Sequence, residues 1–468
     1  MGRDVEEVNR YLRDAVPWAG SGSTWSAHKG DYDFTETTLT TILYLFGHQP
    51  DLLHPETVAH LLDVLLVEEG GAPRLMVPRS MDMILDTENH HLMTEGSRYL
   101  KNQWLFSHGG PGREGNPLYD NRTNGLEAWM VAHLEEIRDH GVYEFNSQPY
   151  LGYTVQALLN LEAFPESEEV RGLARLALDT MNAQYAVGSL DFRRCAPYRR
   201  RLEKGMNPLL ANDPHTQVMR VWCAPESKTL AVASRGDGHQ ALLAAVMPYQ
   251  LPPAFRAWTL AKPREYFVKI GRGLGASPEI YSGSPDFLLG SGGVFRGLRA
   301  SIVARPTTLL LRDRAPDLSG CFHIPGQGRW WHWNNTGVHR RFAVGNYPVS
   351  IPENYPPVVK EGAWSVHAPE CAPGLLIVVH NAENFGLLAL FPESVETPQA
   401  LLDRVRAANP EEGSVRRRFV WPGGAALGYD VNARRGVWPI TEVAGKTVER
   451  DYDLWPQWDG DNVLDDAA

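Results

Sequence analysis

The sequence predicts an α+β protein with two modules: an α/α toroid-like helical domain over residues 1–219 and an antiparallel β-sandwich domain over residues 220–468. The chain has 468 residues, whereas a single domain usually has about 100–200. Residues 1–219 contain 12 of the 34 prolines and 4 of the 14 tryptophans, so both residue types concentrate in the second module. The spacing of apolar residues changes near the same boundary, from a helical period to short strand-like runs.

Apolar residues in the first module recur every third or fourth position, which is the spacing of amphipathic helices. Asp33 is expected to cap the second helix, Pro55 to begin the third and Thr87 to cap the fourth. Pairs of such helices bury a shared inner face, which favours a toroid-like arc. The helices are expected over residues 4–16, 34–46, 55–65, 87–100, 123–140, 149–161 and 167–185.

From about Met219 onward the sequence contains short apolar runs, most of them bounded by Gly, Pro, Asn or Asp, which is typical of β-strands. Many short strands of this kind predict antiparallel sheets packed as a sandwich. An amphipathic helix over residues 398–408 is the expected exception. The expected strand runs are VMRVWCA, TLAVAS, ASIVARPTTLLLRD, GLLIVVHN and FGLLALF.

Composition excludes several classes of protein. The net charge is −11, and the chain has no long Lys/Arg run, which disfavours nucleic acid and anionic membranes as partners. The four cysteines are widely spaced, so neither a disulfide scaffold nor a CxxC zinc site is expected. The chain has no apolar signal region and no transmembrane stretch. We therefore expect a cytoplasmic protein, or a secreted or periplasmic one whose leader has been removed.

The segment from Asp86 to Tyr99 combines acidic and imidazole side chains at the start of a helix. At about 100° per residue, Glu88 and His91 share one helix face with Glu95 and Arg98, while Asn89 and His90 point elsewhere. An N-capped helix start would explain the acidic residues but not the run Asn89-His90-His91.

A second polar segment runs from Tyr143 to Tyr153 and includes Glu144, Asn146 and Tyr150. A helix cap needs one such residue, whereas this loop carries several hydrogen-bonding groups together. The strongest basic stretch follows at residues 193–204 and includes Arg194, Tyr198 and Arg199. A solvated loop is the alternative interpretation of this stretch.

These motifs resemble those of bacterial polysaccharide lyases of the heparinase II/III and alginate lyase type, which combine a helical toroid with a β-sandwich. The resemblance rests on ENH at residues 88–90, on E-[WF]-x-S-x-x-Y at residues 144–150 and on Tyr198-Arg199. It implies an enzyme that cleaves a uronic-acid-containing glycan by β-elimination. The helical module is shorter than a complete six-hairpin toroid, so we expect an incomplete toroid.

The β-elimination mechanism assigns roles to these residues. The substrate carboxylate must be neutralised by hydrogen-bond donors, a base must remove the adjacent proton and an acid must protonate the leaving oxygen. Asn89 and Asn146 are the expected neutralising residues, His90 or His91 the base, and Tyr150 the tyrosine catalyst. Arginine binds carboxylates bidentately, which suits it to flanking uronates. The expected substrate-binding residues are Glu88, His91, Glu144, Tyr153, Arg194, Tyr198, Arg199 and Trp331.

Two other functions remain open. A glycoside hydrolase needs paired carboxylates, which Asp86, Glu88 and Glu144 could supply. A non-catalytic carbohydrate-binding protein would stack sugars on indole rings, for which residues 330–333 (WWHW) are candidates, although core packing also explains such tryptophans. The partner is expected to be an oligosaccharide or polysaccharide in each case.

No cofactor and no metal ion are expected. The sequence lacks HExxH and comparable ligand spacings. Neighbouring histidines on a regular helix point about 100° apart, so His90 and His91 cannot bind one ion together. The P-loop and the GxSxG nucleophile elbow are also missing.

Overall fold

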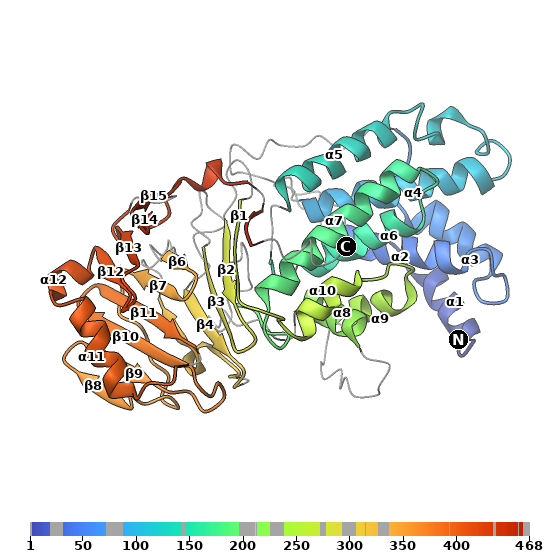
Figure 1. Cartoon of the computed structure of the whole chain (residues 1–468). Coiled ribbons are helices and arrows are strands. Elements are labelled where there is room, and N and C mark those ends of the chain that lie inside the picture. The colour runs from blue at the N-terminus through green and yellow to red at the C-terminus, as the bar shows by residue number, and fades with distance from the viewer. Residues whose placement is uncertain are drawn as a thin grey trace. The chain divides into compact units, whose positions relative to one another are not determined.

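The computed structural model describes the chain except for the segments between the following ranges: residues 2–18, 31–71, 88–142, 146–148, 150–195, 211, 213–224, 238–271, 278–292, 306–313, 315–325, 337–392, 394–433, 437–456 and 458–461. Helices dominate the first part of the chain and antiparallel strands follow, so the predicted α+β class is confirmed (Figure 1). The chain divides into two compact units. The first contains residues 1–144, 149–181 and 231–250, and the second contains residues 145–148, 182–230 and 251–468.

Most helices of the first unit lie close to the ranges predicted from the sequence. A π-helical turn, Leu61–Leu65, continues α3 where the sequence predicted one unbroken helix. The helix α7 passes from the first unit into the second after Met181. The helices are α1 (Val5–Asp14), α2 (Asp33–Phe46), α3 (Pro55–His60), α4 (Glu88–His108), α5 (Leu126–His140), α6 (Leu151–Ala163), α7 (Glu168–Gly188) and α9 (Gly238–Val246), with a 3-10 turn at Pro117–Tyr119.

The central helix of the first unit is α4, which packs against α2, α5 and α6. Its residues are buried around the whole circumference rather than along one stripe, as expected for a core helix. Many of these buried residues are polar and therefore need partners inside the protein. For example, Lys101 donates to the Leu66 carbonyl at 2.6 Å and pairs with Glu69 at 2.7 Å.

The start of α2 differs from the sequence-based expectation. Asp33 is the first residue of the helix rather than its N-cap, and the N-cap is Tyr32, whose side chain makes no capping hydrogen bond. The Asp33 carboxylate is instead a partner of His90. A long-range ionic contact has therefore replaced the local capping bond.

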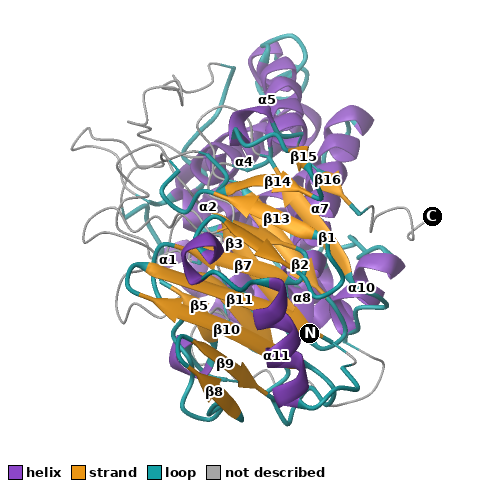
Figure 2. Cartoon of the chain, turned by 60° about the vertical axis from the view of Figure 1, so that its left-hand side comes forward, coloured by secondary structure: helices purple, strands orange, loops and turns teal. Residues whose placement is uncertain are grey.

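The first sheet of the second unit has the strand order β16-β1-β2-β3-β4-β5 and the second has the order β6-β7-β11-β10-β9-β8 (Figure 2). A smaller sheet has the order β12-β13-β14-β15. All pairings in these sheets are antiparallel.

The strands are β1 (Tyr266–Ile270), β2 (Glu279–Gly283), β3 (Phe287–Gly292), β4 (Thr307–Leu311), β5 (Phe322–Ile324), β6 (Gly337–His339), β7 (Phe342–Gly345), β8 (Val359–Glu361), β9 (Trp364–His367), β10 (Leu376–Ala382), β11 (Phe385–Phe391), β12 (Arg418–Val420), β13 (Ala426–Tyr429), β14 (Ile440–Val443), β15 (Lys446–Thr447) and β16 (Asp459–Gly460). The expected strands in GLLIVVHN and FGLLALF are confirmed as β10 and β11, and the helix α11 spans Pro398–Ala408 as predicted. A short helix, α12 (Glu412–Val415), follows it.

The first sheet is buried on both faces, and successive side chains of its strands point to opposite sides. Phe267 and Leu309 contribute to the core shared by all three sheets. Their neighbours Val268 and Leu310 pack into a separate core with Val187 near the end of α7 and with side chains of α10 (Pro253–Leu260). This second core anchors the segment after α7 that carries Arg193 and Arg194.

One predicted strand is wrong. The run at residues 218–224 (VMRVWCA) lies mainly in the helix α8 (Pro214–Cys223). Pro214 occupies the first helical turn and the Asp213 side chain accepts a hydrogen bond from the Thr216 backbone N–H, so the helix start is well capped. This start signal outweighs the β-propensity of the valines. The run TLAVAS lies outside the described residues.

Candidate functional site

The first turn of α4 places the predicted residues Glu88, Asn89, His90 and His91 in the interior, with exposed fractions of 1, 0, 4 and 5 %. Further along the same helix, Arg98 pairs with Glu95 at 3.2 Å and with Glu68 at 2.7 Å. The ionic residues beyond the first turn therefore compensate one another. The chemically distinctive part of α4 is its first turn.

His90 is paired with a residue that the sequence had not linked to it. Its Nδ1–H donates a hydrogen bond of 2.7 Å to Oδ2 of Asp33 at the start of α2. The Asp33 side chain is fully buried and that of His90 is 6 % exposed. A carboxylate on Nδ1 fixes the tautomer and the orientation of the ring.

Aromatic rings surround this pair. Phe34, next to Asp33, lies 5.4 Å from the His90 ring and 4.4 Å from the Tyr153 ring, measured between centroids. The Tyr150 ring lies 6.2 Å from Phe34 and 6.4 Å from His90. The structure thus brings His90 on α4 together with Tyr150 and Tyr153, which lie at the start of α6.

His91 points to a different neighbour. Its ring lies 5.6 Å from the ring of His133 on α5, and His133 stacks on Trp129 at 5.1 Å. This divergence of adjacent side chains agrees with the 100° rotation per residue of a helix. Of the two histidines, His90 is the one that contacts Tyr150.

Two other predicted residues, Asn146 and Arg194, meet in the second unit. Nη1 of Arg194 donates to Oδ1 of Asn146 at 2.6 Å, while Nη2 pairs with Asp213. Nδ2 of Asn146 donates to the Tyr281 hydroxyl at 3.1 Å, which in turn donates to Glu279 at 2.7 Å. The Asn146 amide is thereby oriented at both ends.

The backbone of Asn146 is in the left-handed region, with a φ of 50°. This left-handed region is uncommon for residues other than glycine, and asparagine tolerates it better than most. The Arg194 guanidinium lies 4.9 Å above the Tyr185 ring and is 3 % exposed as a residue. Arg194 therefore orients Asn146 rather than pointing into solvent.

Burial and charge set the protonation states around Arg194. Burial opposes ionisation of Asp213, but Arg194 and hydrogen bonds from Thr216 outweigh it and hold the pKa of Asp213 below its ordinary value. Burial, with Arg194 adding to it, lowers the pKa of His215 to about 3. His215 is consequently neutral and its Nε2–H can donate to Asn182 at 3.0 Å.

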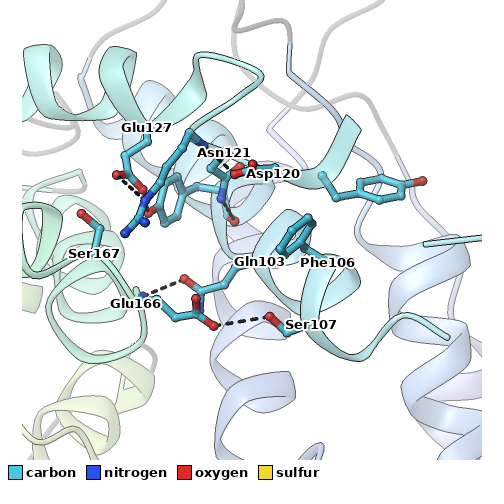
Figure 3. A pocket seen from close by; sticks show the side chains of 11 residues that line it. Gln103, Phe106, Ser107, Asp120, Asn121, Glu127, Glu166 and Ser167 are labelled. Carbon is cyan, nitrogen blue, oxygen red and sulfur yellow. Dashed lines mark hydrogen bonds and ion pairs between the residues drawn. The ribbon is translucent and has the colours of Figure 1, made fainter. Parts of the chain in front are cut away.

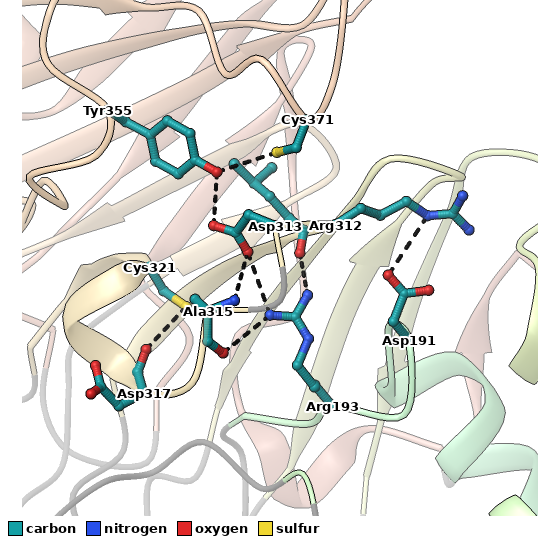
Figure 4. Close-up of polar contacts among 10 residues, drawn as sticks. Asp191, Arg193, Arg312, Asp313, Ala315, Asp317, Cys321, Tyr355 and Cys371 are labelled. Atoms are coloured by element: carbon teal, nitrogen blue, oxygen red, sulfur yellow. Dashed lines mark hydrogen bonds and ion pairs between the residues drawn. The ribbon is translucent and has the colours of Figure 1, made fainter. Parts of the chain in front are cut away.

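The neighbouring Arg193 has a separate role (Figure 4). It pairs with Asp313 at 3.4 Å and donates to the carbonyls of Ala315 and Leu311. The Tyr355 hydroxyl donates to the other Asp313 oxygen at 2.8 Å. The start of the basic stretch is therefore neutralised inside the second unit.

Four predicted site residues, Glu144, Tyr198, Arg199 and Trp331, lie outside the described residues, as does Asp86 of the hydrolase alternative. His90, Tyr150 and Tyr153 belong to the first unit, and Asn146 and Arg194 to the second. Sequence reasoning missed Asp33 as the partner of His90 and Asp213 as the partner of Arg194. The only sequence signal for either was a polar residue at a helix start, which a cap also explains.

A polar pocket of about 200 Å³ lies elsewhere in the first unit (Figure 3). Its groups largely bind one another: Tyr99 donates to Glu127 at 2.8 Å, and Gln103 accepts from the backbone N–H of Glu166 at 2.8 Å. Burial, reinforced by Glu127, raises the pKa of Tyr99. None of the predicted site residues lines this pocket.

Within the described part of the chain, Asp31, Asp33 and His90 form a group with metal-ligating side chains close enough together to hold an ion. No helix among the described residues is both long and apolar enough to cross a membrane. Comparison with protein-family models, curated proteins and solved structures gives no match. The functional inference therefore depends on the site residues themselves.

Proposed function

We propose that this protein is a polysaccharide lyase that cleaves a uronic-acid-containing glycan by β-elimination. The observation that supports the proposal most directly is the 6.4 Å ring separation of His90 and Tyr150, two groups suited to proton transfer. They come from motifs that the sequence singled out independently. The helices are proposed to form an incomplete α/α toroid and the sheets a β-sandwich, as in the lyases that the sequence resembles.

In the proposed reaction, a base removes the proton on the carbon next to the uronate carboxylate. The bond between the neighbouring carbon and the glycosidic oxygen breaks, a carbon–carbon double bond forms, and an acid protonates the departing oxygen. His90 is the proposed base, and its hydrogen bond to Asp33 orients the imidazole ring. Tyr150 is the proposed acid. Proton-transfer groups of this kind each contribute about 10²–10⁴-fold.

The remaining roles concern the substrate carboxylate and the flanking sugars. Asn89 and Asn146 are proposed to donate hydrogen bonds to the carboxylate on which charge develops. Arg194 supports Asn146 through the 2.6 Å hydrogen bond. The other proposed substrate-binding residues are Glu88, His91, Glu144, Tyr153, Tyr198, Arg199 and Trp331.

The test is turnover of a panel of uronate and neutral polysaccharides by the full chain, with absorbance and mass of the products. A lyase yields an unsaturated uronate without addition of water, whereas a hydrolase adds a water molecule to each cleaved bond. Tight glycan binding without any product would favour a non-catalytic carbohydrate-binding protein. Hydrolysis, or binding alone, contradicts the proposal.

The key variant is Tyr150→Phe, which removes only the hydroxyl group. We expect turnover to fall by about 10²-fold or more, with unchanged circular dichroism. Tyr11→Phe is the matched control, because Tyr11 lies in the same unit and is 75 % exposed. Full activity of Tyr150→Phe would remove Tyr150 from the mechanism.

A further inference from the structure

Asp33 has one carboxylate oxygen whose burial the fold does not explain. The residue is fully buried, and Oδ2 accepts the hydrogen bond from His90. Oδ1 has no hydrogen-bond partner among the described residues. It therefore makes no capping hydrogen bond to the backbone of α2 either. A buried carboxylate oxygen without a partner costs about 1–3 kcal/mol or more and calls for a bound ion or water.

Two further ligating groups lie beside this carboxylate. Asp31, Asp33 and His90 each offer one ligand atom, and these atoms lie within 4.8 Å of one another. Metal bonds to oxygen and nitrogen are about 2.0–2.4 Å long, so two ligands across an ion are at most about 4–4.8 Å apart. The spacing therefore suits a single ion without large movement of the backbone.

The set of donors indicates the class of ion. Two carboxylates and an imidazole suit first-row divalent cations such as Mn²⁺ and Zn²⁺, whereas Mg²⁺ and Ca²⁺ favour oxygen ligands throughout. Carboxylate ligands also offset the positive charge of a divalent cation. Asp31 is exposed and so gives the group access to solvent.

We propose that Asp31, Asp33 and His90 form a binding site for one first-row divalent cation. This inference does not rest on the proposed function, because it follows from the ligand spacing and the buried Asp33 oxygen. Three protein ligands leave coordination positions for water or for a substrate carboxylate. A cation bound here takes His90 as a ligand, so the proposed role of His90 as base belongs to the cation-free protein.

The experiment is calorimetric titration of the full chain, freed of metal by chelation, with MnCl₂ and with ZnCl₂, and with MgCl₂ for comparison. We expect saturable binding of one Mn²⁺ or Zn²⁺ per chain, with much weaker binding of Mg²⁺. Asp33→Asn and Asp31→Asn each remove a ligating charge at nearly constant volume. Each is expected to weaken binding by about 10–100-fold or more.

Asp51→Asn is the matched control, because Asp51 is an exposed aspartate of the same unit and should leave binding unchanged. If Asp33→Asn fails to fold, the Asp31→Asn variant still tests the site, because Asp31 is exposed. Absence of saturable binding, or equal binding by the Asp31 variant, would overturn the cation site. Glycan cleavage by a protein that binds no cation contradicts this inference alone. Cation binding without product from any glycan contradicts the proposed function alone.

Discussion

Nδ1–H of His90 donates a 2.7 Å hydrogen bond to Oδ2 of Asp33, although 57 residues separate the two in the chain. Both side chains are buried, and they join the first turn of α4 to the first residue of α2. Breaking a buried pair by removal of one partner is more costly than removing both, because the remaining group stays desolvated. This contact therefore links the candidate site to the stability of the helical core.

His90→Ala is expected to lower the free energy of unfolding by about 3–5 kcal/mol in chelator-containing buffer, because it leaves Asp33 buried without its partner. The double variant Asp33→Asn/His90→Ala should be more stable than His90→Ala, since no buried charge remains. Urea denaturation measures both, with the exposed His140→Ala as control. A double variant as unstable as the sum of the single variants would contradict the pairing.

Asp213→Asn is expected to destabilise the protein at neutral pH by about 3–5 kcal/mol, because Arg194 would lose its buried counter-ion. The pKa of Asp213 is depressed in the folded protein. Its stabilising effect is therefore complete above the unfolded-state pKa of about 3.9 and is lost as the pH falls through the folded value. Acid denaturation curves should show a larger loss of stability below about pH 4 in the wild type than in the variant. An equal loss of stability in the variant would contradict the assignment of this effect to Asp213.

His215 should make the free energy of unfolding depend on pH over a higher pH range than Asp213 does. Its pKa in the folded protein is lowered to about 3 by burial, with a contribution from Arg194, against about 6.5 when unfolded. The unfolded chain binds the extra proton between these values, so stability falls as the pH decreases through the window, by about 1.4 kcal/mol per pH unit. His215→Gln should flatten this part of the curve. An unchanged slope in urea denaturation from pH 6 to 4 would contradict the assignment.

Lys262 is expected to make the free energy of unfolding depend on pH in the alkaline range. Its ammonium group is buried and donates to the carbonyls of Ala186 and Trp258 at 2.5 and 2.6 Å. Burial lowers its pKa to about 7, compared with about 10.4 in the unfolded chain. The unfolded chain binds more protons between these values, so stability should rise with pH across the window. Lys262→Met should remove this rise, which denaturation at pH 7, 8.5 and 10 would detect.

The sequence alone located most helices of the first module and some of the strands of the second. The helices α2, α5 and α11 lie close to where the spacing of apolar residues placed them, because this signal acts within a few residues. The strands β10 and β11 were equally visible as short apolar runs. The helix α8 was missed because its valines resemble a strand, while its start signal lies upstream at Asp213 and Pro214.

Tertiary structure decided which polar residues are partners. Sequence motifs selected His90, Tyr150, Asn146 and Arg194, but a motif records only local spacing. Asn146 and Arg194 are 48 residues apart and meet only because the chain folds back on itself. The sequence predicted that Asp33 caps a helix. In the folded protein Asp33 instead pairs with His90, and its other carboxylate oxygen is buried without a hydrogen-bond partner among the described residues. Local periodicity thus fixes the elements, whereas ionic pairing, burial and the candidate cation site depend on packing between distant segments.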